Sequence, residues 1–214
     1  MAASEPQIPW KETIAITPEE SENLAIIERY FAVIHSGGDP FPRLAPRVAL
    51  RRLAPADLED FQAYRSDPEV ARYQSWSSMS VAEATAFLTE RETAPFGRPG
   101  WFQIGIAERS TGRLVGDIGI CLHRNASEPA EIGFTLATLW QRQGLASEAV
   151  RETLAMLFEN TEVAQVIAIT DTRNLASIRL LERVGFLLSR TIPASFRGEP
   201  CTEHVFVLGR SVKT

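Results

Sequence analysis

The chain has 214 residues, of which 44% are hydrophobic and 23% charged, and its formal net charge is −5. This composition is ordinary for a soluble globular protein, and a chain of this length needs no disulfide bonds to be stable. The mild acidity argues against nucleic acid as a partner, because phosphate contacts require clustered Lys and Arg.

Targeting and metal-binding signals are missing from the sequence. The N-terminus lacks the basic start and apolar run of a signal peptide, and no apolar run approaches the length of a membrane span. Cys121 and Cys201 have no neighbour at metal-ligand spacing, and no pair of histidines has it either. We therefore expect a cytoplasmic protein with free thiols, no metal and no membrane contact.

The first predicted element is an isolated amphipathic helix. Thr17-Pro18-Glu19-Glu20 combines an N-cap hydroxyl with a capping-box glutamate, and apolar residues follow at the spacing of one helix face. Residues 36–46 contain three prolines and two glycines and indicate a linker. We expect an extension over residues 1–46 and a domain over 47–214. The helix could pack on its own domain or a second copy, or cover the active site, so a monomer and a homodimer both remain open.

The main domain predicts alternating groups of strands and helices. Helices follow an initial strand, then come a three-strand meander, a helix, a strand, a helix and two closing strands. This order favours a mixed α/β or α+β sheet over a doubly wound dinucleotide fold. The predicted strands are 48–51, 102–106, 114–122, 131–136, 163–169, 186–189 and 204–208, and the helices are 55–65, 67–73, 80–92, 144–157 and 174–184.

The strongest motif is a turn that leads into a helix. It is Trp140-Gln141-Arg142-Gln143-Gly144-Leu145-Ala146-Ser147-Glu148-Ala149. The first N–H groups of a helix have no partner inside it, and the helix dipole places positive potential there. Gly144 and Ala146 keep the side chains short, so a bulky anion can approach the backbone. The turn predicts a phosphate or pyrophosphate site, although a glycine at a helix start can also serve packing alone.

A second motif follows the predicted strand of residues 163–169. Asn174 can cap the helix that begins there, and Ser177 comes one turn later on the same side. Both side chains could therefore face a ligand that runs between neighbouring strands. Taken separately, Asn174 is better explained as a cap alone and Ser177 as a solvated hydroxyl.

The two motifs together resemble the GCN5-related N-acetyltransferase (GNAT) superfamily. The shared pattern is Gln141-x-x-Gly144-x-Ala146 followed by Asn174-x-x-Ser177-x-Arg179-Leu180-Leu181-Glu182-x-x-Gly185-Phe186. The chain is most similar to the branch of ribosomal-protein N-terminal acetyltransferases and their small-molecule relatives. The resemblance implies a mixed, mostly antiparallel sheet of six to seven strands flanked by helices. It also implies that coenzyme A lies between splayed strands four and five.

The resemblance assigns a role to each motif. The turn would hold the pyrophosphate of coenzyme A through backbone amides, and the strand of residues 134–136 would pair with the pantetheine. An amide on that strand would polarise the thioester carbonyl. Asn174 would bond to the pantetheine, and Ser177 would lie near the sulfur. The implied binding residues are Phe134, Thr135, Leu136, Gln141, Arg142, Gln143, Gly144, Leu145, Ala146, Ser147, Asn174 and Ser177.

The implied reaction is attack of a primary amine on the thioester of acetyl-CoA. A carboxylate acting through water can remove the proton of the amine. Glu131, in Glu131-Ile132-Gly133-Phe134, is the candidate base, because this branch often has a glutamate there. The alternative is a strand-edge charge that points at solvent.

The sequence departs from the superfamily at one position. Many members carry a tyrosine at the position of Leu181, as a general acid for the leaving thiolate. Either Ser177 assists the thiolate, or no acid is used, because a thiol with a pKa of about 8.5 is a good leaving group. Neither Tyr64 nor Tyr73 can be assigned this role from the sequence.

The acceptor amine remains open. A protein N-terminus and a small-molecule amine both fit, and so does transfer of a longer acyl group. Alternative functions are an aminoglycoside-type acyltransferase, which acidic residues near the pocket would favour, and a non-catalytic acyl-CoA-binding module. Aromatic side chains could line an acceptor pocket or belong to the core: Tyr73, Trp76, Trp101 and Phe102.

Overall fold

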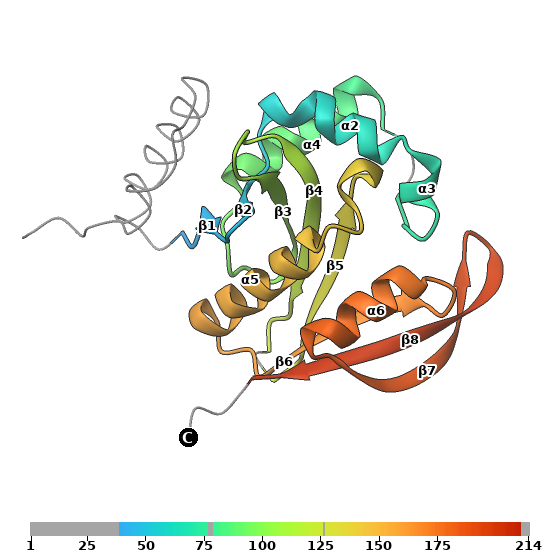
Figure 1. Ribbon diagram of the computed structural model, residues 1–214. Helices are drawn as coiled ribbons and strands as arrows, with labels where there is room; N and C mark the ends of the chain where they lie inside the picture. Colours follow the sequence, from blue (N-terminus) through green and yellow to red (C-terminus); the bar gives the residue numbers. More distant parts are fainter. Residues whose placement is uncertain (1–38, 77–78, 126, 211–214) are drawn as a thin grey trace, which may run out of the picture.

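The computed structural model describes residues 39–76, 79–125 and 127–210. They form one eight-stranded sheet in the order β1-β2-β3-β4-β5-β6-β8-β7, flanked by helices (Figure 1). The amphipathic helix predicted at the N-terminus lies outside the described residues. Within them, no helix combines the length and the apolar character that crossing a bilayer requires.

The predicted fold class is confirmed. The strands are β1 Arg43–Leu44, β2 Val48–Arg52, β3 Gly100–Glu108, β4 Leu114–Leu122, β5 Ala130–Leu136, β6 Gln165–Asp171, β7 Leu187–Phe196 and β8 Glu199–Gly209. The helices are η1 Pro55–Asp57, α2 Leu58–Arg65, α3 Pro68–Ala71, α4 Val81–Thr93, η2 Thr138–Trp140, α5 Leu145–Asn160 and α6 Leu175–Val184. Neighbouring strands in the sheet are antiparallel, except that β5 and β6 are parallel.

The eighth strand comes from the segment that the sequence predicts to be a linker. β1 pairs with β2 through Arg43 and Leu44. Phe41 is 1% exposed and stacks on Phe102 of β3 with ring centroids 5.8 Å apart. Arg43 also forms ion pairs with Glu152 and Glu159 of α5. The prolines suggested a linker, but one buried aromatic ring fixes this segment to the sheet.

The two faces of the sheet carry separate hydrophobic clusters. The larger cluster packs one face against α5, and includes Ile104 and Ile106 of β3. The smaller cluster lies under α2 and α4, on the opposite face. A side chain at Gly105 would meet Leu53 and Leu114 of the smaller cluster, as the alternation of strand side chains requires.

The closing hairpin is longer than the sequence predicts. β7 and β8 span 10 and 11 residues and form the outer part of the sheet beyond β6 (Figure 1). Pro193 lies inside β7, which tolerates it because β7 is the edge strand. The turn at Arg197 and Gly198 has positive φ at both residues (52° and 83°), which is typical of a tight hairpin turn.

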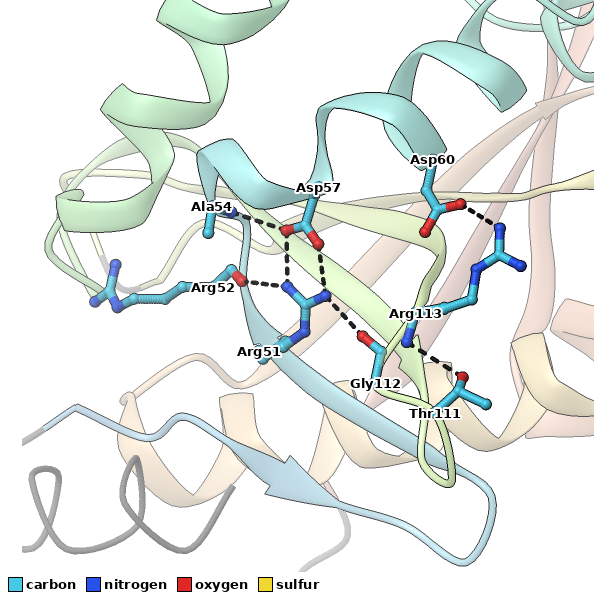
Figure 2. A network of polar contacts seen from close by, with 8 residues as sticks. All are labelled: Arg51, Arg52, Ala54, Asp57, Asp60, Thr111, Gly112 and Arg113. Carbon is cyan, nitrogen blue, oxygen red and sulfur yellow. Dashed lines mark hydrogen bonds and ion pairs between the residues drawn. The ribbon is translucent and has the colours of Figure 1, made fainter. Parts of the chain in front are cut away.

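A polar network fixes the start of α2 against the sheet (Figure 2). The guanidinium of Arg51 on β2 forms two hydrogen bonds to the carboxylate of Asp57, at 2.6 and 2.7 Å. The same guanidinium donates to the carbonyl of Gly112 in the β3–β4 turn, and Arg113 of that turn pairs with Asp60 of α2. These contacts join β2, the start of α2 and the β3–β4 turn.

Candidate active site

A cleft opens where β5 and β6 separate. The two strands are paired at Ala130↔Val166 and Glu131↔Ile167, and beyond these residues they diverge. The cleft encloses about 600 Å³, its open mouth included. Gly133 and Phe134 line it from β5, and Asn174 and Ser177 line it from α6. The structure therefore brings three predicted site residues, Phe134, Asn174 and Ser177, around one cavity.

The turn before α5 presents a row of free backbone amides. Arg142 and Gly144 both have positive φ, 61° and 83°, and such turns form anion-binding concavities. No amide from Arg142 to Ser147 has a hydrogen-bond acceptor within the described part of the chain. The side chain of Gln141 donates to the Leu136 carbonyl at 2.9 Å and holds the turn against the end of β5. The geometry suits an anion at the N-terminus of α5.

Arg47 adds a positive charge to this turn. Its guanidinium donates to the Gln143 carbonyl at 2.8 Å and pairs with Glu148 at 3.0 Å. Glu148 also accepts from the backbone amides of Arg47 and Val48, so the acidic residue in the first turn of α5 is neutralised. Sequence reasoning missed Arg47, because it lies 96 residues from Gln143 and only the pairing of β2 with its neighbours brings it there.

Asn174 has the capping role that the sequence predicts. Its side-chain oxygen accepts from the Ser177 amide at 3.2 Å, which satisfies one of the unpaired donors at the start of α6. The side chain also lines the cleft, so capping and ligand binding are compatible at this position. Leu181, one turn beyond Ser177, lines the cleft too and is almost fully buried.

Glu131 lies in the interior of the sheet and not at an edge. It is opposite Cys121 of β4 and Ile167 of β6, and its side chain is half-buried. Burial raises the pKa of the Glu131 carboxyl; His123 opposes this shift and Glu203 adds to it. Glu131 does not itself line the cleft, but Gly133, two residues along the same face of β5, does. A base placed here would act through water on a group above Gly133.

Thr135 and Leu136 are buried and do not line the cleft. The carbonyl of Leu136 is already occupied by Gln141, and that of Phe134 accepts from the Gln74 side chain at 3.4 Å. Of the three residues predicted to pair with pantetheine, Phe134 lines the cavity, and Thr135 and Leu136 do not.

The segment after α3 forms a wall of the cleft that sequence reasoning left unassigned. Tyr73 and Gln74 both line the cavity, and the Tyr73 hydroxyl donates to the Arg173 carbonyl at 3.3 Å. Phe196, Asp171 and Glu203 line it from the other side. The guanidinium of Arg173 donates two hydrogen bonds to Asp171 and its backbone amide donates a third, and these bonds lower the pKa of the Asp171 carboxyl. The sequence named Tyr73 among the aromatic residues that could line a pocket, but no local pattern marks the others, because they meet only through the tertiary fold.

The other aromatic residues considered for an acceptor pocket lie outside the cleft lining. Phe102 is buried in the larger cluster, and Trp76 lies against the smaller one with the Arg65 guanidinium 3.8 Å from its ring. Trp101 is 54% exposed and lies over Gly119 of β4. Of the four, only Tyr73 lines the cleft.

A buried polar cluster lies between α2 and β4. Asp117 is 1% exposed and accepts from the Tyr64 hydroxyl, from Arg65 at 2.9 Å and from Gln103 at 2.5 Å. Burial, followed by the Asp117 charge, raises the pKa of Tyr64 well above its usual value. Tyr64 therefore stays protonated and structural. Among the described residues, no three His, Cys, Asp or Glu side chains are grouped as metal ligands.

Comparison with known proteins finds the same architecture. A family model for the acetyltransferase (GNAT) domain matches residues 47–187. The chain is 31% identical over 147 residues to the uncharacterized N-acetyltransferase YoaA of Bacillus subtilis (strain 168). The matched region covers 68% of this chain and 83% of that protein.

Two solved structures with bound coenzyme A species share the fold. One is the microcin C7 self-immunity acetyltransferase MccE in complex with acetyl-CoA and AMP, with a TM-score of 0.68 and 13% identity over 78% of this chain and 94% of that one. The other is RimJ of Mycobacterium smegmatis in complex with CoA-disulfide, with a TM-score of 0.66 and 20% identity over 76% and 81% of the two chains.

Proposed function

This chain is an acyl-CoA-dependent N-acetyltransferase of the GNAT family, and we propose that it moves acetyl from acetyl-CoA to a primary amine bound beside Glu131. The observation that carries the proposal is the cleft between β5 and β6. Asn174 and Ser177 line this cleft, and the amide-rich turn from Arg142 to Ser147 follows Gln141, whose side chain is bonded to the end of β5.

Coenzyme A fits the cleft in one direction. The pyrophosphate binds the free amides before α5, where the helix dipole favours negative charge and the Arg47 guanidinium balances the charge of Glu148. The pantetheine then runs between β5 and β6, past Phe134 and the side chain of Asn174. Ser177 contacts the region of the sulfur. The thioester carbonyl is polarised by a backbone amide of β5, a kind of contact that is typically worth about 3–4 kcal/mol of barrier.

Glu131 is the base in this mechanism. Its raised pKa makes it a better proton acceptor than an exposed carboxylate. Through a water above Gly133 it takes the proton of the amine as the nitrogen attacks the thioester carbon. Direct attack by the amine requires no acyl-enzyme, which agrees with a cleft whose lining residues include no cysteine.

One observation favours a cationic acceptor. Glu203 lines the cleft near Glu131, and its charge contributes to the raised pKa of the Glu131 carboxyl. An acceptor with a second positive charge would relieve this repulsion. An aminoglycoside-type or polyamine acceptor is therefore the second candidate beside a protein N-terminus.

The first experiment is thermal unfolding with and without acetyl-CoA. At one hundred times the dissociation constant the ligand should stabilise the protein by about 2.7 kcal/mol, which raises Tm by roughly 5–10 °C for a chain of this size. NAD is the control and should leave Tm unchanged. No rise with millimolar acetyl-CoA would contradict the assignment of the cleft to coenzyme A.

The second experiment measures thiol release from acetyl-CoA with a panel of amines. Peptides with free N-termini, spermidine and an aminoglycoside test the two acceptor classes. Sustained release with one class identifies the acceptor. A protein that binds acetyl-CoA but releases thiol with none of them would favour the acyl-CoA-binding module.

A further inference from the structure

The proposed reaction expels a thiolate, and the residues that line the cleft limit what can protonate it. Their side-chain O–H groups belong to Tyr73, Thr170 and Ser177. A phenol, with an unperturbed pKa of about 10, is the group best matched to a thiol of about 8.5. Aliphatic hydroxyls do not titrate in this range, so Ser177 and Thr170 are poorer proton donors than Tyr73.

Two other positions can be set aside on structural grounds. Tyr64 donates its hydroxyl proton to buried Asp117 on the α2 side of the sheet, and it does not line the cleft. Leu181 of α6 lines the cleft but carries no proton to donate. Ser177 is thus the one side chain of α6 that brings a hydroxyl to the cleft. The phenol belongs to Tyr73, in the segment that follows α3.

The Tyr73 hydroxyl lies at the positive end of α6. It donates to the carbonyl of Arg173 at 3.3 Å, and Arg173 directly precedes Asn174, the N-cap of this ten-residue helix. The helix dipole stabilises the negative charge of a thiolate at this end. The bond to the carbonyl is long, so a sulfur anion within reach would be a stronger acceptor for the same proton.

Contacts on both sides of Tyr73 hold it in this place. The Arg197 guanidinium in the β7–β8 turn donates to the carbonyls of Ala71 at 3.2 Å and Gln74 at 3.4 Å. The Gln74 side chain in turn donates to the Phe134 carbonyl on β5. The segment is therefore anchored to the hairpin and to the strand that borders the pantetheine path, and Tyr73 lies between these anchors.

We propose that Tyr73 is the proton donor to the departing thiolate of coenzyme A, a role that rests on the function proposed above. As the amine nitrogen bonds to the carbonyl carbon, the C–S bond breaks and its electron pair stays on sulfur. The proton of the Tyr73 hydroxyl passes to sulfur, while Glu131 receives the proton of the amine. Transfer of one proton through solvent from Glu131 to the Tyr73 phenolate then restores the site.

The test uses coenzyme A alone and needs no acceptor. Full-length wild type, Tyr73→Phe and Ser177→Ala are saturated with coenzyme A, and the thiol is titrated through the ultraviolet absorbance of the thiolate. A donor to sulfur stabilises the thiolate, so Tyr73→Phe should raise the pKa of the bound thiol by about one unit. Ser177→Ala should shift it by less.

The outcomes separate the two proposals. A coenzyme A-dependent rise of Tm in all three proteins shows that the ligand is bound, and its absence in wild type counts against the function itself. With the ligand bound, an unshifted thiol pKa in Tyr73→Phe, or a larger shift in Ser177→Ala, overturns the role of Tyr73. In turnover, Tyr73→Phe should lower kcat by roughly 10²-fold with an unchanged KM for acetyl-CoA, whereas a merely structural role would alter both.

Discussion

The polar side chains at and near the cleft form hydrogen bonds to backbone groups more than to one another. Gln141 donates to the Leu136 carbonyl, Tyr73 to that of Arg173, and Asn174 caps α6. These backbone partners lie on β5, on α6 and in the turn between β6 and α6, so the side chains are oriented before any ligand binds. Glu131 is different, because it is half-buried and its charge is opposed by burial and by Glu203. The fold keeps an unfavourable carboxylate at this position, which is expected of a functional group.

Glu131→Gln should lower kcat/KM by roughly 10²–10⁴-fold, because the amide cannot accept the proton of the amine. In wild type, activity should rise with pH through the pKa of Glu131, and this acid limb should lie above the range of an exposed carboxylate. The pH profile of thiol release with an accepted amine measures both. An acid limb that persists unchanged in Glu131→Gln would assign the base to another residue.

The same substitution should stabilise the fold at neutral pH. A carboxyl whose pKa is raised on folding favours the folded state only while it is protonated, and this stability is lost as pH rises through the folded pKa. Glu131→Gln removes that loss, so its Tm should exceed that of wild type at pH 7. The difference should vanish below about pH 4.3, the unfolded pKa of glutamate.

At the scale of elements, the cleft results from unequal strand pairing, because β5 and β6 each pair more extensively with their outer neighbour than with each other. β6 pairs with β8 from Gln165↔Gly209 to Asp171↔Glu203, along its whole length. β5 is drawn toward β4, because Gly116 lets the backbone of Thr135 and Leu136 approach to a distance that no side chain would allow. β5 is paired with β4 and β6 is paired with β8. The two inner edges pair at only two residues, and beyond these residues the strands separate.

The turn before α5 yields the prediction at this scale. Gly144→Glu places a carboxylate among the free amides and forces a side chain onto φ of 83°. Affinity for acetyl-CoA should fall by about 10²-fold or more, because like charges in a binding site cost several kcal/mol. Gly97→Glu is the matched control, since Gly97 has φ of 84° with open space around it and does not line the cleft. Equal losses in both variants would mean that the anion does not bind at this turn.

At the scale of the molecule, one core joins two halves of the sheet. Ile132 of β5 and Phe206 of β8 belong to the same cluster, so the halves are held together by packing below the gap. The segment before β2 belongs to this core through Phe41. The predicted domain boundary at residue 47 remains a prediction, but residues 41–45 contact the sheet.

Phe41→Ala should destabilise the protein by about 3–5 kcal/mol, because it removes a fully buried ring packed between Phe96 and Phe102. The expected fall in Tm is roughly 10 °C. Leu139→Ala, at a residue that is 87% exposed, should change stability by no more than about 0.5 kcal/mol. A small effect of Phe41→Ala in thermal unfolding would show that the segment is a dispensable arm.

Local patterns in the sequence were enough to predict the helices and most strands. The capping box at Ser80, the cap at Asn174 and the glycine that ends α6 are all where the sequence predicts them. The strands of the closing hairpin were predicted too short, because Pro193 and Pro200 interrupt the pattern and the Arg197-Gly198 turn is an uncommon hairpin pair.

The sequence by itself determined the family, the fold class and the two motifs, because each motif is one continuous stretch made of a turn and residues of the helix that follows it. Only the tertiary structure decided which residues form the opposite wall. Tyr73, Gln74 and Glu203 of this wall come from segments far from those motifs, and strand order and helix packing place them. Arg47, beside the turn before α5, is brought there in the same way. β6 pairs with β8 along its whole length but with β5 at only two residues, and this difference creates the cavity. No local sequence pattern encodes it.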